Sequence, residues 1–160
     1  MMLGLAESVR LIEDEGFANV LARHKRFAAA TRAAVAHWGG HVKPSGVTVS
    51  AQGFSGRLGA IEIMCTDPAR HSDSVTTILL PSGHDADALR ALAHHRYNLA
   101  LGSGLGPLQG HAFRIGHLGD LNEPMLLGAI ATTELALAEA GVPHATGGVA
   151  AAIASLRRVA

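Results

Sequence analysis

One arginine stands out as a side chain that could bind an acid. Arg114 lies between Phe113 and Ile115, and this alternation of polar and bulky apolar residues is typical of a short strand. Successive strand side chains point to opposite faces, so Arg114 would face away from helices that covered Phe113 and Ile115. A guanidinium held there could bind a carboxylate or phosphate through two parallel hydrogen bonds. It could equally be a solvated residue or half of a structural ion pair.

The residues after Arg114 predict a turn and then a helix. Gly116 and Gly119 supply the backbone freedom that a turn needs. Asn122 is a good N-cap, and Pro124 suits the first helical turn, where its missing N–H has no helical partner. Arg114 would therefore stand just before a fixed strand–turn–helix connection.

A metal centre has weaker support than an acid-binding arginine. The chain has 10 histidines, but His94 and His95 are adjacent and cannot easily share one ion from a helix. His37 and His41 have the i, i+4 spacing, yet the glycines at 39–40 between them break the helix that this spacing requires. We expect no metal site.

Nucleophilic catalysis also lacks its usual motifs. No Gly-x-Ser-x-Gly elbow is present, and Cys65 lies in an apolar run where we expect it to pack in a strand. The glycine-rich run 102–107 is similar to a phosphate loop, but Pro107 replaces the third glycine, so we interpret the run as a tight turn. We assign no catalytic residue to this chain.

Composition places the chain among globular proteins. Its 160 residues suit a single domain over 1–160, with 48% hydrophobic and 16% charged residues. A formal net charge of zero gives no electrostatic case for nucleic acid or an anionic membrane surface. A lone cysteine fits a reducing compartment, and no signal peptide or membrane-spanning run is visible, so we expect a cytoplasmic protein.

The hydrophobic pattern predicts alternating helices and strands. We expect helical residues from 3 to 38, divided or kinked at Gly16, and three later helices at 86–97, 123–140 and 147–157. Strands are expected at 61–65, 75–80, 99–101 and 113–115. This order favours an α+β two-layer sandwich in which a small, mostly antiparallel sheet carries helices on one face. Residues 41–60 are interpreted as an inserted loop or extra strand.

The run from Phe113 to Met125 resembles the C-terminal signature of class V aminotransferases of the serine–glyoxylate and alanine–glyoxylate (serine–pyruvate) type. Four further segments fall in the family's order: Arg23-His24, Ser72-Asp73-Ser74-Val75, Arg96-Tyr97-Asn98 and Leu101-Gly102. The resemblance is to the C-terminal small domain of these fold-type I enzymes, which have the α+β fold expected above. In the family, the arginine of this motif, here Arg114, binds the carboxylate of the amino or oxo acid.

The resemblance also implies a cofactor and partners. Family enzymes use pyridoxal phosphate, held through a Schiff-base lysine in a large domain that this chain does not contain. The chain has only Lys25 and Lys43, neither in a matching context, so we expect no cofactor bound covalently to it. The expected partners are the missing large domain, a small carboxylic acid, and a second copy in a homo-oligomer such as a dimer. Phe17, Leu21 and Trp38 are the expected apolar patch for self-association.

Three interpretations stay open. The chain could be the small domain of such an aminotransferase, separated from its large domain. It could be a stand-alone small-acid-binding or oligomerisation module with the same fold. It could also be a structural domain in which Arg114 forms only an ion pair.

Overall fold

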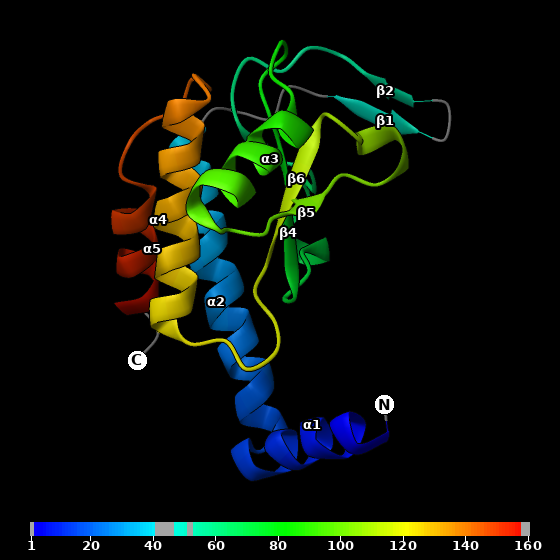
Figure 1. The fold of residues 1–160 in the computed structure, drawn as a ribbon, viewed down its shortest axis with the longest axis vertical. Helices are drawn as coiled ribbons and strands as arrows, with labels where there is room; N and C mark the ends of the chain where they lie inside the picture. Colours follow the sequence, from blue (N-terminus) through cyan, green and yellow to red (C-terminus); the bar gives the residue numbers. More distant parts are fainter. Residues whose placement is uncertain (1, 41–46, 51–52, 158–160) are drawn as a thin grey trace.

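The computed structural model describes residues 2–40, 47–50 and 53–157. The helical N-terminal region is two helices, α1 (Met2–Glu15) and α2 (Phe17–Trp38). Gly16 separates them with φ 85°, a left-handed backbone conformation that favours glycine. Because the chain turns there, α1 projects away from the rest of the molecule, at the bottom of Figure 1.

The main sheet has four antiparallel strands in the order β3-β4-β6-β5. Their bounds are Glu62–Ile63 for β3, Val75–Leu79 for β4, Gly102–Ser103 for β5 and Ala112–Gly116 for β6. In the register of the central strands, Thr77 pairs with Arg114 and Val75 with Gly116. On the other side of β6, Gly102 pairs with Arg114.

Helices lie on one side of this sheet. α2 and α3 (Ala86–Tyr97) contact the strands, while α4 (Glu123–Glu139) and α5 (Gly148–Arg157) pack against α2 and each other. The N-cap predicted at Asn122 is present, since its side chain accepts from Met125 N, and the Asp85 side chain caps α3 by accepting from Asp87 N. The main core joins both layers through Phe27, Ile78, Phe113, Leu126, Ile130 and Leu137. The α+β fold with a small antiparallel sheet is confirmed.

A two-stranded hairpin lies outside the main sheet. It consists of β1 (Thr48–Ser50) and β2 (Gly53–Ser55), and Phe54 packs against the second, smaller core formed by Leu58, Leu79 and Ala112. Leu79 and Ala112 belong to the sheet face opposite the helices, so this segment covers part of that face. Of the predicted inserted segment, 41–46 and 51–52 lie outside the described residues, and its status as an insertion stays a prediction.

Two strand predictions were wrong in their bounds. The strand predicted at 61–65 ends at Ile63, because the chain turns into a short 3-10 helix at Pro68–Arg70 capped by the Asp67 side chain. The strand predicted at 99–101 begins only at Gly102. Asn98 adopts a left-handed conformation and Leu99 N bonds back to Ala93 O, so these residues end α3 instead.

The predicted exposure of Trp38 was also wrong. Trp38 is 1% exposed, whereas Phe17 is 66% and Leu21 52% exposed. α5 packs so closely over the indole that a Cβ placed on Gly148 would lie 2.2 Å from Trp38 Nε1. Trp38 is therefore a core residue between α2 and α5.

Candidate functional site

Arg114 lies at the centre of the sheet on the face away from the helices. Its neighbours Phe113 and Ile115 are buried in the main core, while Arg114 is only partly buried. Thr77 of β4 and Gly102 of β5 flank it as its register partners. The hairpin and Leu58 cover the part of this face near Leu79 and Ala112.

The Arg114 side chain leans over β5. Nε donates a hydrogen bond to Ser103 O at 2.8 Å. Gly102 leaves room for this path, since a Cβ there would lie 3.3 Å from Arg114 Nε. Among the described residues, none forms an ion pair or hydrogen bond with the terminal nitrogens Nη1 and Nη2. Nε is thus fixed by the backbone, while the N–H groups of the two terminal nitrogens are available to an acid.

The loop that follows Arg114 is held by the N-terminal part of α2. Arg23 Nη1 donates to Gly119 O at 2.7 Å and to Leu121 O at 3.1 Å. The remaining Arg23 nitrogens bind the Glu15 carboxylate, which lowers the pKa of Glu15 below its ordinary value. Gly119 N lies 3.1 Å from His24 Nε2 and donates to it.

These loop contacts give the matched segment Arg23-His24 a structural role. The sequence identified Arg23-His24 only as a segment that resembles the family and did not indicate what these residues do. Arg26 adds an ion pair to Glu123 in the first turn of α4. Arg23, His24 and Arg26 of α2 therefore hold the turn between β6 and α4. Gly102 and Ser103, which position Arg114, were also recognisable only as residues of a matched segment or glycine-rich run.

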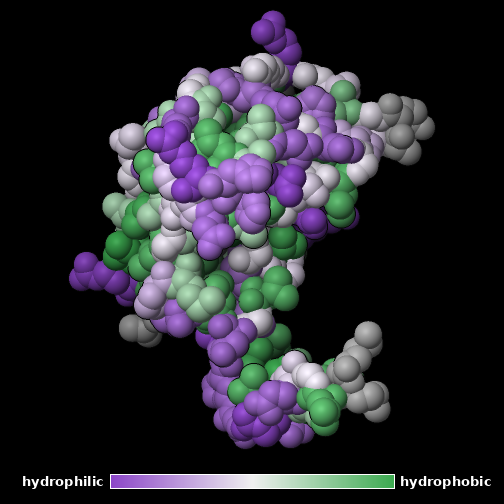
Figure 2. All heavy atoms as spheres, in the orientation of Figure 1, coloured by the Kyte–Doolittle hydropathy of each residue, from purple (hydrophilic) through white to green (hydrophobic). Residues whose placement is uncertain are grey.

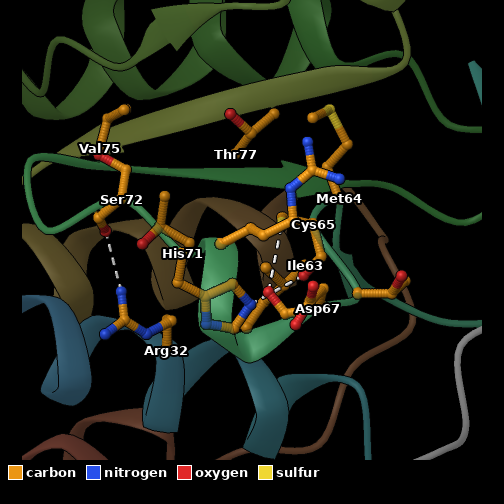
Figure 3. Close-up of a pocket in the computed structure, with 12 residues that line it drawn as sticks. Arg32, Ile63, Met64, Cys65, Asp67, His71, Ser72, Val75 and Thr77 are labelled. Carbon is orange, nitrogen blue, oxygen red and sulfur yellow. Dashed lines mark hydrogen bonds between the residues drawn. The ribbon is translucent and has the colours of Figure 1, made fainter.

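A pocket lies beside β4, on the side away from β6. This pocket of about 450 Å³ is lined on one side by Val75 and Thr77, and Figure 3 shows Arg32, Cys65 and His71 around it. His71 Nε2 lies 2.8 Å from Cys65 O. Cys65 was predicted to pack in a strand, but it follows β3 and its Sγ donates to Asp67 O at 3.4 Å.

The pocket and the Arg114 guanidinium lie on opposite sides of the Arg114 strand. Thr77 lines the pocket from β4, whereas the guanidinium leans the other way, over β5. Adjacent strands are about 5 Å apart, so two strand spacings of about 10 Å separate the two places. Arg114, Gly102 and Ser103 are accordingly not among the residues that line the pocket.

The described residues do not fit a covalently held pyridoxal phosphate. Lys25 is exposed on the surface of α2, and Lys43 lies outside the described residues. In the part of the chain that the structure describes, no three His, Cys, Asp or Glu side chains gather to hold a metal ion, and no helix is long and apolar enough to span a membrane.

The chain is similar to aminotransferases along nearly its whole length. It is 42% identical over 158 residues to the serine–glyoxylate aminotransferase of Methylorubrum extorquens and 40% identical over 150 residues to the L-aspartate–glyoxylate aminotransferase of Paracoccus denitrificans. These matches cover 98% and 93% of this chain. The chain belongs to the class V aminotransferases. No protein-family model matches the sequence.

Solved aminotransferases share the fold of this family member. The pyridoxamine–pyruvate aminotransferase from Mesorhizobium loti superposes with a TM-score of 0.74 and 29% sequence identity over 94% of this chain. The chain covers 34% of that structure, and 34% and 33% of the two curated relatives. It thus spans about a third of the length of the aminotransferases it matches. This agrees with the resemblance to their small domain.

Proposed function

We propose that this chain is the carboxylate-binding small domain of an aminotransferase that uses pyridoxal phosphate. Its substrates are small amino and oxo acids, with serine or alanine as donor and glyoxylate or pyruvate as acceptor. Arg114 binds the acid's carboxylate. The two relatives above support this class, because the serine, aspartate and glyoxylate of their names all carry a carboxylate beside the reacting carbon.

The observation that carries the proposal is the way in which Arg114 is held. Nε is anchored to Ser103 O, so the guanidinium plane is restrained before any ligand arrives. No described carboxylate pairs with Arg114, in contrast to Arg23, Arg26 and Arg90, which form ion pairs with Glu15, Glu123 and Asp87. A preorganised guanidinium with two unused terminal nitrogens matches the two oxygens of a carboxylate.

The remaining chemistry belongs to residues outside this chain. Pyridoxal phosphate, when bound in a complete enzyme, supplies an electron sink for the substrate's α-carbon. This chain would orient the substrate by its carboxylate and leave the lysine and the cofactor contacts to the larger domain. Because this chain spans about a third of its relatives, that larger domain is the partner we propose.

A chimera tests this function. This chain would replace the matching third of the Methylorubrum enzyme, and steady-state kinetics with serine and glyoxylate would be measured. Arg114→Ala should lower kcat/KM by roughly 30- to 150-fold, because a bidentate charged pair contributes about 2–3 kcal/mol. Arg114→Lys should rescue only part of the loss, since an ammonium cannot reproduce the fork.

Arg10→Ala is the matched control. Arg10 is an exposed arginine of α1, paired with Glu7 and outside the segments that resemble the family. This variant should leave kcat/KM within about twofold of the parent. If Arg114→Ala unfolds the domain while activity per folded molecule is unchanged, Arg114 is structural. Acid binding by an inactive chimera would instead favour a non-catalytic binding module.

A further inference from the structure

The residue directly after β6 is a fully buried histidine. His117 Nδ1 lies 3.1 Å from Asp73 O, and Nε2 lies 2.9 Å from the Thr76 hydroxyl oxygen. The backbone N–H of His117 also donates to Ser74 O at 2.9 Å. Three hydrogen bonds thus tie this one residue to the segment in which β4 begins.

The partners determine the tautomer of His117. A backbone carbonyl can only accept, so Nδ1 carries the proton and donates to Asp73 O. Nε2 of the neutral ring then accepts from the Thr76 hydroxyl. Both ring nitrogens are therefore satisfied when the ring is neutral.

Two charged groups face this ring, Arg32 from α2 and Asp73 from the segment before β4. Burial lowers the pKa of His117 most strongly, and the Arg32 charge acts in the same direction. The hydrogen bond to the Asp73 carbonyl and the Asp73 carboxylate act oppositely. Arg32 also donates to Ser72 O at 3.0 Å, so the segment 72–74 is held from two sides.

The position of this contact matters for Arg114. Val75 with Gly116 is the last pair of the β4–β6 ladder, and Thr77 with Arg114 is two pairs further in. A slip of one residue in such a ladder would move Arg114 to the helix-covered face. His117 bonds across the end of the ladder to Thr76, the residue between these two pairs.

We infer that His117 is a positioning residue for Arg114: through Thr76 and Asp73 it fixes the end of β6 so that the guanidinium stays over Gly102 and bonded to Ser103. The consequence for substrate rests on the proposed function of Arg114. The effect on the position of Arg114 can be measured without substrate.

The experiment follows Nε–H signals of arginine by NMR in the 160-residue chain. Arg114→Lys identifies the Arg114 signal. His117→Asn and Thr76→Val should each speed hydrogen exchange of the Arg114 Nε–H roughly tenfold, because the Ser103 bond opens more often. Thr76→Ser, which keeps the hydroxyl, should stay within about twofold of the parent.

Arg90 supplies an internal control. Its Nε donates to Leu101 O at 2.9 Å, next to β5, but it comes from α3. General destabilisation would speed exchange at both arginines equally, and that result, or an unchanged Arg114 signal in folded Thr76→Val, would overturn the inference. If His117→Asn does not fold, the comparison of Thr76→Val with Thr76→Ser decides.

Titration of the same samples with glyoxylate separates this inference from the proposed function. If Thr76→Val speeds exchange of the Arg114 Nε–H but glyoxylate does not change the Arg114 signal of the parent, His117 is a positioning residue and acid binding by Arg114 is contradicted. If glyoxylate changes the Arg114 signal of the parent but Thr76→Val does not, acid binding by Arg114 is supported and the positioning role of His117 is contradicted.

Discussion

The Arg114 side chain passes directly over the backbone of Gly102, its partner in the next strand. A Cβ on Gly102 would lie 3.1 Å from Arg114 Cβ and 3.3 Å from Arg114 Nε. Both distances are shorter than ordinary carbon contacts of 3.5–4.0 Å. The absence of a side chain at position 102 thus leaves the space that the Arg114 side chain occupies.

Gly102→Ala should therefore disturb Arg114 without unfolding the domain. The added methyl forces the arginine to shift by a few tenths of an ångström, and we expect kcat/KM of the chimera to fall about threefold to tenfold. Gly128→Ala is the control, because a Cβ on Gly128 meets nothing within 4 Å. Equal kcat/KM values for Gly102→Ala and the parent would show that the position of Arg114 does not depend on a glycine at 102.

Glu134 joins three helices, and its replacement should destabilise the chain. From α4 its carboxylate accepts from Trp38 Nε1 of α2 at 3.0 Å and from Gly147 N, just before α5, at 2.5 Å. Glu134→Gln should lower the free energy of unfolding by about 2 kcal/mol and Tm by about 4–8 °C. Glu139→Gln, on the same helix but paired with the exposed Arg96, should change Tm by less than about 2 °C in thermal melts.

The same carboxylate predicts a loss of stability in acid. Burial by itself raises the pKa of Glu134, but the hydrogen bonds from Trp38 and from backbone N–H groups at 147–149 outweigh it, so the pKa lies below 4.5. A lowered pKa stabilises the fold above pH 4.5, and this contribution is lost as the pH falls toward the folded-state pKa. Urea unfolding of Glu134→Gln and the parent should converge as the pH falls below 4.5; a constant difference would contradict this.

We expect His117 to make the stability of the fold depend on pH in a second, higher range. Its pKa is lowered from the ordinary 6.5, so below pH 6.5 the unfolded chain binds a proton that the folded chain does not. The stabilisation is full above pH 6.5 and declines as the pH falls toward the folded-state pKa. Melts between pH 8 and pH 5 should show a steeper decline for the parent than for His117→Asn, and parallel curves would count against a buried neutral ring.

The isolated chain should self-associate through the surface of α1 and the start of α2. Exposed apolar side chains gather there: Leu3, Leu5, Val9, Leu11, Ile12, Phe17 and Leu21. Figure 2 shows hydrophobic residues on this projecting arm, and a pocket of about 650 Å³ lies between it and the loop at 118–120. Such clustering exceeds the scattered apolar residues of an ordinary surface.

Sedimentation velocity would measure this association. Leu5→Glu combined with Phe17→Ser should shift the chain toward monomer, because a charge and a hydroxyl replace apolar contact area. Leu135→Glu is the control, since Leu135 is similarly exposed, at 50%, but lies on α4. A clean monomer at high concentration in the parent, or equal effects of both changes, would contradict the prediction.

Local sequence signals determined the elements of this protein. The 3.6-residue period, together with the cap at Asn122, placed α3 and α4 within a residue of their observed bounds. Alternation alone indicated that Arg114 and its neighbours Phe113 and Ile115 point to opposite faces. Each of these signals lies within one helix or one strand, where backbone geometry fixes the period of the side chains.

Tertiary structure decided which segments meet. Trp38 has the spacing of an amphipathic helix, but only the packing of α5 shows that it is buried. Arg23 reaches a loop 96 residues away, and His117 bonds to Thr76, 41 residues earlier. The anchor of Arg114 on Ser103 exists because β5 pairs with β6 at Gly102. Contacts between distant segments depend on strand order and helix packing, which the local period of a sequence does not encode.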